Sequence, residues 1–157
     1  LVSRSLKLAD VAPTNHVTLR STLPIGVENV SGVRVAEDRV YLSRNAVYDY
    51  TTCTGAAPCL PAVAEEGGMS AVGGIRAGTL SVVSELKGDA RWPAAARGTK
   101  VALYTDTGLS VYDTSAPTAK LLTEARLRGW GYTSFVAMSD DHMLCSLGEF
   151  GLQSISF

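Results

Sequence analysis

The chain has 157 residues, of which 46% are hydrophobic and 18% are charged, and its formal net charge is −1. This balance excludes an intrinsically disordered chain and is typical of one globular domain with an apolar core. It also argues against nucleic acid as a partner, because no basic run or basic surface pattern is present. No apolar run approaches the roughly 18 residues that a transmembrane helix needs, and the start at Leu1 without Met or a signal-peptide pattern suggests a processing boundary.

Short alternating and β-branched segments recur along the whole chain without a sustained helical period, so we expect an all-β fold. The segments fall into repeats of about 40 residues with four short strands each, which is the pattern of β-propeller blades. The expected strands, in chain order, are residues 6–9, 17–23, 33–36, 39–43, 46–50, 80–86, 93–96, 101–105, 109–113, 120–126, 134–138, 143–146 and 152–157.

The repeats predict a single partial β-propeller with about three blades of four-stranded antiparallel sheets. Residues 1–30 supply the last two strands of an earlier blade, and residues 31–88 form a blade with an inserted loop at 51–78. Residues 89–128 form the next blade, and residues 129–157 form one that lacks its outer strand.

We expect this open arc to be part of a larger ring. An unpaired edge at residues 152–157 would promote aggregation unless another strand covered it. The cover comes from the remaining segment of the same protein or from a second copy of this chain. The first is favoured, because the chain starts within a blade and two copies would bring an extra strand to each junction.

Acidic residues recur at the ends of strands. Asp10, Asp49 and Asp113 end successive third strands, and we interpret them as turn-forming residues that bond local backbone amides. The pairs Glu37–Asp38 and Asp140–Asp141 fall in the turns between first and second strands. Their recurrence at one turn position favours a structural role, because the ligand spacing of a calcium loop is missing.

Two of the three cysteines flank a short loop. Cys53 and Cys59 bracket a segment with Gly55 and Pro58, whose turn could bring the two sulfurs together. We predict a disulfide here, with a reduced pair in a loop as the alternative, and a buried free thiol at Cys145. A disulfide favours an oxidising compartment, so the expected location is secreted, periplasmic or at the cell surface.

The repeat resembles a known family. The run 108–117 (GLSVYDTSAP), followed by KLL at 120–122 and FVA at 135–137, is similar to the LVIVD repeat of bacterial and archaeal surface propellers. Residues 6–49 match the same spacing. The resemblance implies a surface propeller and indicates the fold much better than the function. The chain departs from the pattern at Ser156, where the repeat would have aspartate, and at the inserted residues 51–78.

Propeller sites usually lie on the face formed by the loops between second and third strands and the connections between blades. Arginine and aromatic residues in exposed loops anchor protein interfaces and stack on sugar rings. Trp92 and Trp130 have an alternative role as wedges between blades. The binding-face candidates are Arg44, Asn45, Asp89, Arg91, Trp92, Asp106, Trp130, Tyr132, Glu149 and Phe150.

Signals for catalysis are weak. There is no Gly-x-Ser-x-Gly elbow, and His16 and His142 fall away from the predicted face. Asp89, Asp106 and Glu149 could supply the carboxylate pair of a glycosidase, but their separations are not fixed by sequence. No phosphate-binding glycine loop and no histidine–cysteine spacing for zinc is present, so we expect no cofactor and no metal.

The sequence therefore predicts a non-catalytic recognition or scaffold module that binds a protein or a glycan through loops on one face. The alternative is part of a propeller enzyme, a hydrolase or lyase, whose active site is completed by blades outside this chain.

Overall fold

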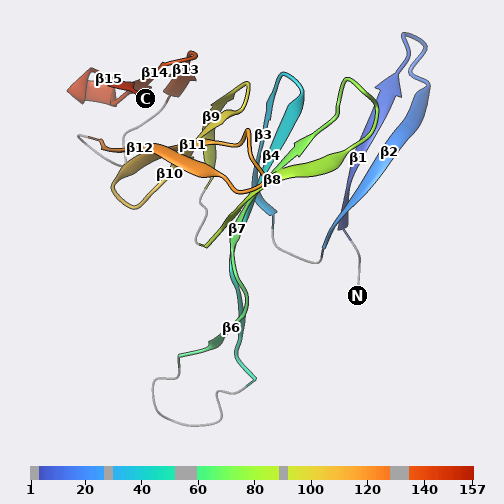
Figure 1. Cartoon of the computed structure of the whole chain (residues 1–157), viewed down its shortest axis with the longest axis horizontal. Helices are drawn as coiled ribbons and strands as arrows, with labels where there is room; N and C mark the ends of the chain where they lie inside the picture. Colours follow the sequence, from blue (N-terminus) through green and yellow to red (C-terminus); the bar gives the residue numbers. More distant parts are fainter. Residues whose placement is uncertain (1–3, 27–29, 52–59, 89–91, 128–134) are drawn as a thin grey trace.

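The computed structural model describes residues 4–26, 30–51, 60–88, 92–127 and 135–157. Within these ranges the chain is nearly all β, as the sequence predicts, and its strands form several small antiparallel sheets (Figure 1). The described part holds one short 3₁₀ turn, η1 (Gly148–Phe150), and no helix long and apolar enough to cross a membrane.

Four sheets make up the body of the molecule. The first sheet pairs β1 (Arg4–Val11) with β2 (Val17–Gly26). The second sheet has the order β3 (Val30–Ala36), β4 (Arg39–Arg44), β7 (Gly68–Gly73) and β8 (Ser81–Lys87). The third sheet is β9 (Pro93–Arg97), β10 (Lys100–Tyr104), β11 (Gly108–Asp113) and β12 (Lys120–Arg126). The fourth sheet is β13 (Phe135–Met138), β14 (His142–Ser146) and β15 (Leu152–Ser156).

A fifth, two-stranded ribbon projects from the second sheet. It pairs β5 (Val47–Asp49) with β6 (Ala62–Glu65) and stands away from the body (Figure 1). We call residues 45–67 the arm, of which 52–59 lie outside the described residues.

The arm corrects the expected layout of the second sheet. The sequence pattern assigned the third strand to residues 46–50 and an inserted loop to 51–78. In the structure β4 pairs with β7, and β7 pairs with β8, so the third strand is Gly68–Gly73 and the insertion falls between the second and third strands. Every residue of β7 is buried, so this strand is covered on both faces. Its small residues do not alternate with polar ones, which is why the pattern missed it.

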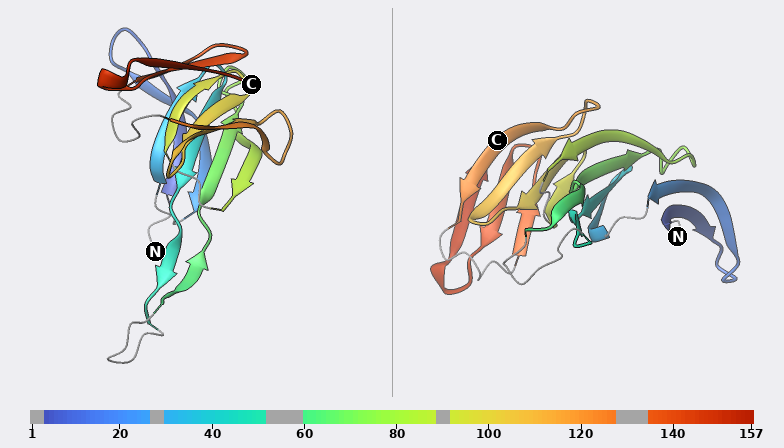
Figure 2. Two further views of the ribbon diagram at one scale, coloured as in Figure 1. Left: turned by 90° about the vertical axis from the view of Figure 1, so that its left-hand side faces the viewer. Right: turned by 90° about the horizontal axis from the view of Figure 1, so that it is seen from below.

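The four sheets follow one another in an arc (Figure 2). The first strands of neighbouring sheets lie next to each other, β3 against β9 and β9 against β13. The second and third sheets thus pack one face against the sheet before and the other against the sheet after, whereas the first and fourth sheets each pack against one neighbour.

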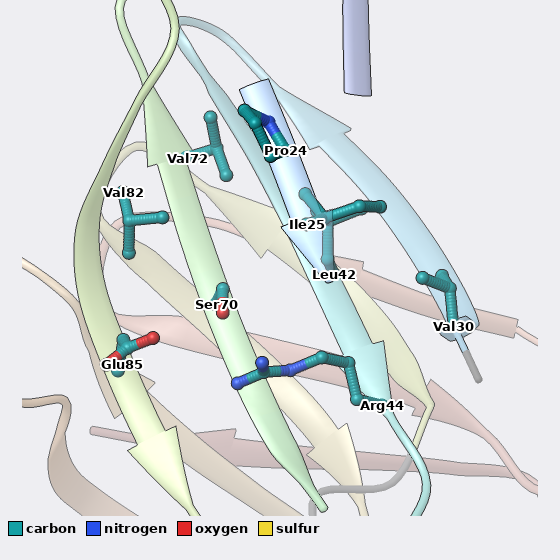
Figure 3. A pocket seen from close by; sticks show the side chains of 9 residues that line it. All are labelled: Pro24, Ile25, Val30, Leu42, Arg44, Ser70, Val72, Val82 and Glu85. Carbon is teal, nitrogen blue, oxygen red and sulfur yellow. The ribbon is translucent and has the colours of Figure 1, made fainter. Parts of the chain in front are cut away.

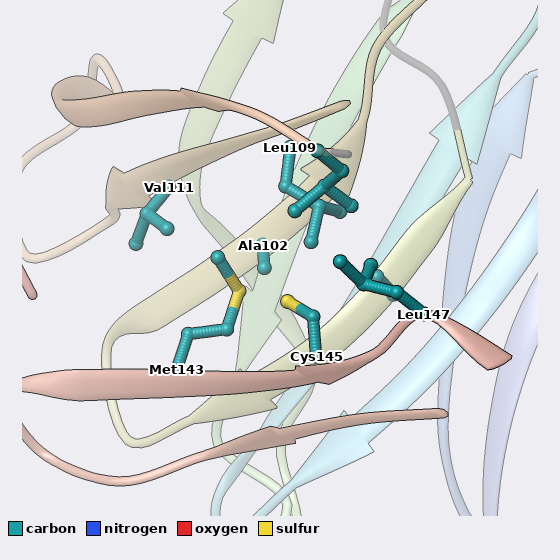
Figure 4. Packing of buried hydrophobic residues seen from close by; sticks show 8 residues of the cluster. Ala102, Leu109, Val111, Met143, Cys145 and Leu147 are labelled. Atoms are coloured by element: carbon teal, nitrogen blue, oxygen red, sulfur yellow. The ribbon is translucent and has the colours of Figure 1, made fainter. Parts of the chain in front are cut away.

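Apolar side chains fill the spaces between the sheets. Between the second and third sheets lie Tyr41, Met69, Ala71, Val101 and Leu103, all at most 3% exposed. A second buried cluster lies between the third and fourth sheets (Figure 4) and consists of Ala94, Ala102, Leu109, Val111, Leu127, Met143, Cys145 and Leu147. Val40, Leu42 and Val72 contact the first sheet.

Polar contacts join the sheets at the edge that carries the turns between first and second strands. The guanidinium of Arg39 donates to the carbonyl oxygen of Thr114 at 2.6 Å, and Arg97 Nε donates to Asp140 Oδ1 at 2.7 Å. The first bond joins the second sheet to the third, and the other joins the third sheet to the fourth. The acidic turn residue Asp140 therefore has a structural role.

The turn-forming aspartates behave as predicted at two of three positions. Asp49 accepts hydrogen bonds from the amide and hydroxyl of Thr51, which lower the pKa of its carboxyl. Asp113 accepts bonds from the amide and hydroxyl of Ser115 in the same way. Asp10 differs, because it accepts a hydrogen bond from Arg20 Nε across the β1–β2 hairpin at 2.5 Å.

Candidate binding surface

Those predicted binding residues that the structure describes lie along one edge of the sheets. We call this edge the loop edge. Here the first and third strands of each sheet begin, and the second and fourth strands end. Arg44 is the last residue of β4, Asn45 follows it at the base of the arm, and Trp92 precedes β9. Asp106 lies in the β10–β11 turn, and Glu149 and Phe150 lie in η1. The other candidates, Asp89, Arg91, Trp130 and Tyr132, lie outside the described residues.

Among the predicted binding residues that are described, Trp92 and Phe150 are exposed aromatic side chains. Trp92 is 63% exposed, so its indole lies at the surface and does not wedge between sheets. Its carbonyl oxygen accepts a 3.0 Å hydrogen bond from the amide of Tyr104, which holds the start of β9 beside the end of β10. Phe150 is 54% exposed. Both side chains are therefore open to solvent.

Two glycines fix how the arm leaves the body. A Cβ atom on Gly68 would come within 2.4 Å of the carbonyl oxygen of Leu86, and one on Gly67 within 2.9 Å of the amide nitrogen of Ala46. The carbonyl oxygen of Gly67 also accepts a 3.1 Å hydrogen bond from the amide of Gly88. The backbones at the base of the arm are therefore too close for any side chain, and the arm is anchored in the second sheet.

The arm carries an exposed apolar face. Tyr48 is directly opposite Val63 in the β5–β6 pair, so their side chains share a face, and they are 50% and 55% exposed. Tyr50 follows two residues after Tyr48 and is 65% exposed, and Leu60 near the tip is 93% exposed. Residues of this kind in a two-stranded ribbon have no core of their own to enter.

A small pocket lies between the first and second sheets (Figure 3). Its volume is about 160 Å³, below the roughly 300 Å³ at which ligand pockets begin. Ile25 of β2 covers Leu42 of β4, and Arg44 points across the opening toward Ser70 (Figure 3). Its lining residues are Pro24, Ile25, Val30, Leu42, Arg44, Ser70, Val72, Val82 and Glu85. The pocket suits a few water molecules better than an organic cofactor.

The titratable groups with shifted pKa values are structural rather than clustered on the loop edge. Burial raises the pKa of the Cys145 thiol, which lies in the core between the third and fourth sheets. A hydrogen bond from His142 lowers the pKa of Asp141 in an exposed turn at the opposite edge. Among the described residues no group of three or more His, Cys, Asp or Glu side chains could hold a metal ion.

The sequence pattern missed the arm. Its signal was present as two tyrosines two residues apart, followed at a distance by the glycine pair 67–68. Cys53 and Cys59, for which a disulfide is predicted, belong to the arm but lie outside the described residues.

Comparisons with known proteins add no assignment. No family model matches the chain, and no curated protein matches it. The loop edge and the arm are therefore the features on which a function can be proposed.

Proposed function

We propose that this chain is a non-catalytic recognition module of a β-propeller protein and that it binds a protein partner through the loop edge, with the arm as the main contact. The remaining blades come from another segment of the propeller. The location in an oxidising compartment stays a prediction, because it depends on the Cys53–Cys59 disulfide.

The exposed face of the arm carries this proposal. Tyr48 and Val63 are opposite each other on a ribbon that projects from the second sheet, and Tyr50, just after β5, adds a third exposed apolar side chain. Tyrosine is enriched at the centres of protein interfaces, since it buries a large area at a low cost in side-chain entropy. A ribbon inserted into a complementary groove would cover this face, whereas a sugar ring would cover one tyrosine and leave the valine exposed.

The electrostatics of the arm indicate what the partner surface carries. The sequence of the arm contains Asp49, Glu65 and Glu66 and no Lys or Arg, so the arm is acidic at neutral pH. Hydrogen bonds from Thr51 lower the pKa of Asp49 and favour its charged form. We therefore expect a partner groove with apolar walls and a basic rim.

Binding that depends on the arm is the test. The immobilised chain and its Tyr48→Ser/Tyr50→Ser variant are exposed to proteins from the organism that produces the chain, and retained proteins are quantified by mass spectrometry. A Val17→Ser/Leu19→Ser variant is the matched control, because these residues are 61% and 56% exposed on β2, outside the arm. A glycan array is probed with the same three proteins.

We expect the arm variant to retain its partner at least about tenfold less well than the unmodified chain, as for a truncated hot spot. The control variant should retain the partner normally. Equal retention by the arm variant, or arm-dependent binding to the glycan array, would contradict a protein partner at the arm.

A further inference from the structure

An apolar strip lies uncovered on the first strand of the second sheet. Val33 and Val35 of β3 are opposite Leu42 and Val40 of β4, so all four side chains point to the face that meets the first sheet. Leu42 and Val40 are 3% and 7% exposed because the first sheet packs on them, whereas Val33 and Val35 are 56% and 62% exposed. The first sheet thus covers only part of this face.

The equivalent position in the fourth sheet is covered. Val136 and Met138 of β13 occupy the matching face and are partly buried against the cluster that contains Ala94 and Ala102 of the third sheet. The cover there is provided by β9 and β10, the first two strands of the preceding sheet. Within the described residues the first sheet consists of β1 and β2 alone and has no strands equivalent to β9 and β10.

The first sheet also has a free edge. In the second and third sheets the third strand is paired on both sides, β7 by β4 and β8, and β11 by β10 and β12. In the first sheet β1 corresponds to such a third strand, because it comes before β2, the strand that leads to β3. Within the described ranges β1 pairs with β2 alone. Its outer backbone groups are therefore available to another strand.

We propose that the β1 edge together with Val33 and Val35 binds an antiparallel pair of β-strands whose inner face carries small apolar side chains. The strand next to β1 extends the first sheet by backbone hydrogen bonds, and the second strand covers Val33 and Val35, as β9 does for Val136 and Met138. The site is continuous with the interface already formed by Leu6, Leu23 and Ile25, and it does not depend on the arm.

The strand pair comes from a polypeptide segment other than a second copy of this chain. A second copy has three pairs of first and second strands, β3–β4, β9–β10 and β13–β14, but in each pair the second strand already carries a third strand, β7, β11 or β15, at the place that β1 would take. A second copy would have to displace one of these third strands before it could complete the first sheet.

A fusion that supplies such strands tests the proposal. A copy of residues 93–104, which are β9 and β10 with their turn, is joined ahead of Arg4 through a glycine–serine linker of about 12 residues, which spans about 20 Å. The matched control fusion carries Glu at the copies of Ala94 and Ala102. Hydrogen exchange of the β1 amides, thermal unfolding and solution mass are measured for both fusions and for the unfused chain.

We expect the β1 amides that do not bond to β2 to exchange at least about tenfold more slowly in the fusion than in the control fusion. Val33→Glu/Val35→Glu in the fusion should abolish the protection. The same substitution in the unfused chain should leave its unfolding temperature unchanged, because both side chains are exposed there, which separates loss of docking from loss of folding.

Equal exchange in the two fusions would overturn the proposal. A dimeric unfused chain that dissociates on Val33→Glu/Val35→Glu would also overturn it, since a second copy would then occupy the strip.

Discussion

The phenolic hydroxyl of Tyr41 donates a 2.7 Å hydrogen bond to the carbonyl oxygen of Gly98. Tyr41 lies in β4 of the second sheet, and Gly98 lies in the β9–β10 turn of the third, so one side chain links two sheets. The ring is fully buried among Met69 and Val101. A buried tyrosine normally finds a partner for its hydroxyl, and here that partner sets how the two sheets align.

Removing this hydroxyl should weaken the contact between the sheets. We expect Tyr41→Phe to lower the free energy of unfolding by about 1–2 kcal/mol, because the Gly98 carbonyl loses a buried bond. Tyr48→Phe on the exposed arm is the control and should change the stability by less than about 0.5 kcal/mol. Urea unfolding followed by circular dichroism measures both, and equal stability of the two variants would show that water replaces the bond.

Alkaline pH should destabilise the fold through the same residue. Burial raises the pKa of Tyr41, and burial is also the main cause of the raised pKa values of Tyr104 and Tyr112. Because the folded state holds these protons more tightly than the unfolded state, the contribution of the three tyrosines to stability is constant up to the ordinary tyrosine value of about 10 and falls as pH rises beyond it.

In urea midpoints measured between about pH 8 and pH 11, the tyrosines should therefore contribute a decrease above about pH 10. Burial also raises the pKa of the Cys145 thiol, so this group should add a decrease that begins at the lower ordinary value of a thiol. The decrease should be smaller in Tyr41→Phe than in the unmodified chain. A decrease of the same size in both would assign the alkaline effect to other groups.

The core between the third and fourth sheets should be sensitive to cavities. Leu109 is fully buried in it, so Leu109→Ala should cost about 2–5 kcal/mol of unfolding free energy. Leu152→Ala is the matched control on β15, where the side chain is 69% exposed, and it should be nearly neutral. Thermal unfolding ranks the two variants, and a neutral Leu109→Ala would mean that the neighbouring side chains collapse into the space.

The cysteines should differ in reactivity. Cys145 is fully buried and its thiol pKa is raised by burial, so a maleimide should label it only after unfolding. If Cys53 and Cys59 form the predicted disulfide, they stay unlabelled in denaturant until a reductant is added. Intact mass after labelling counts the modified thiols. One label in denaturant without reductant is the expected result, and three labels would contradict the disulfide.

Much of the strand pattern was predictable, because a strand with one face covered alternates apolar and polar residues. The segment 120–126 was predicted with the bounds that the structure has, and residues 109–113 differ from β11 by one residue. The turn role of Asp49 and Asp113 followed from side-chain chemistry that needs only neighbours in sequence.

The errors fall where neighbours distant in sequence decide the structure. Residues 46–50 have the composition of a strand, and part of the segment is one, but its partner is β6 rather than β4. Residues 68–73 contain two glycines, a serine and an alanine, and they form a central strand only because sheets cover both of its faces. Because residues 46–50 lead into the arm instead of pairing with β4, Tyr48 and Tyr50 stay exposed.

By itself the sequence determined an all-β chain of short antiparallel strands, because the period of two and the turn residues are local properties of the backbone. Only the tertiary structure decided which strand is central, where the arm projects and that Val33 and Val35 are uncovered. Burial is a property of the whole fold: the same valine is a core residue or a contact residue according to which sheet lies over it.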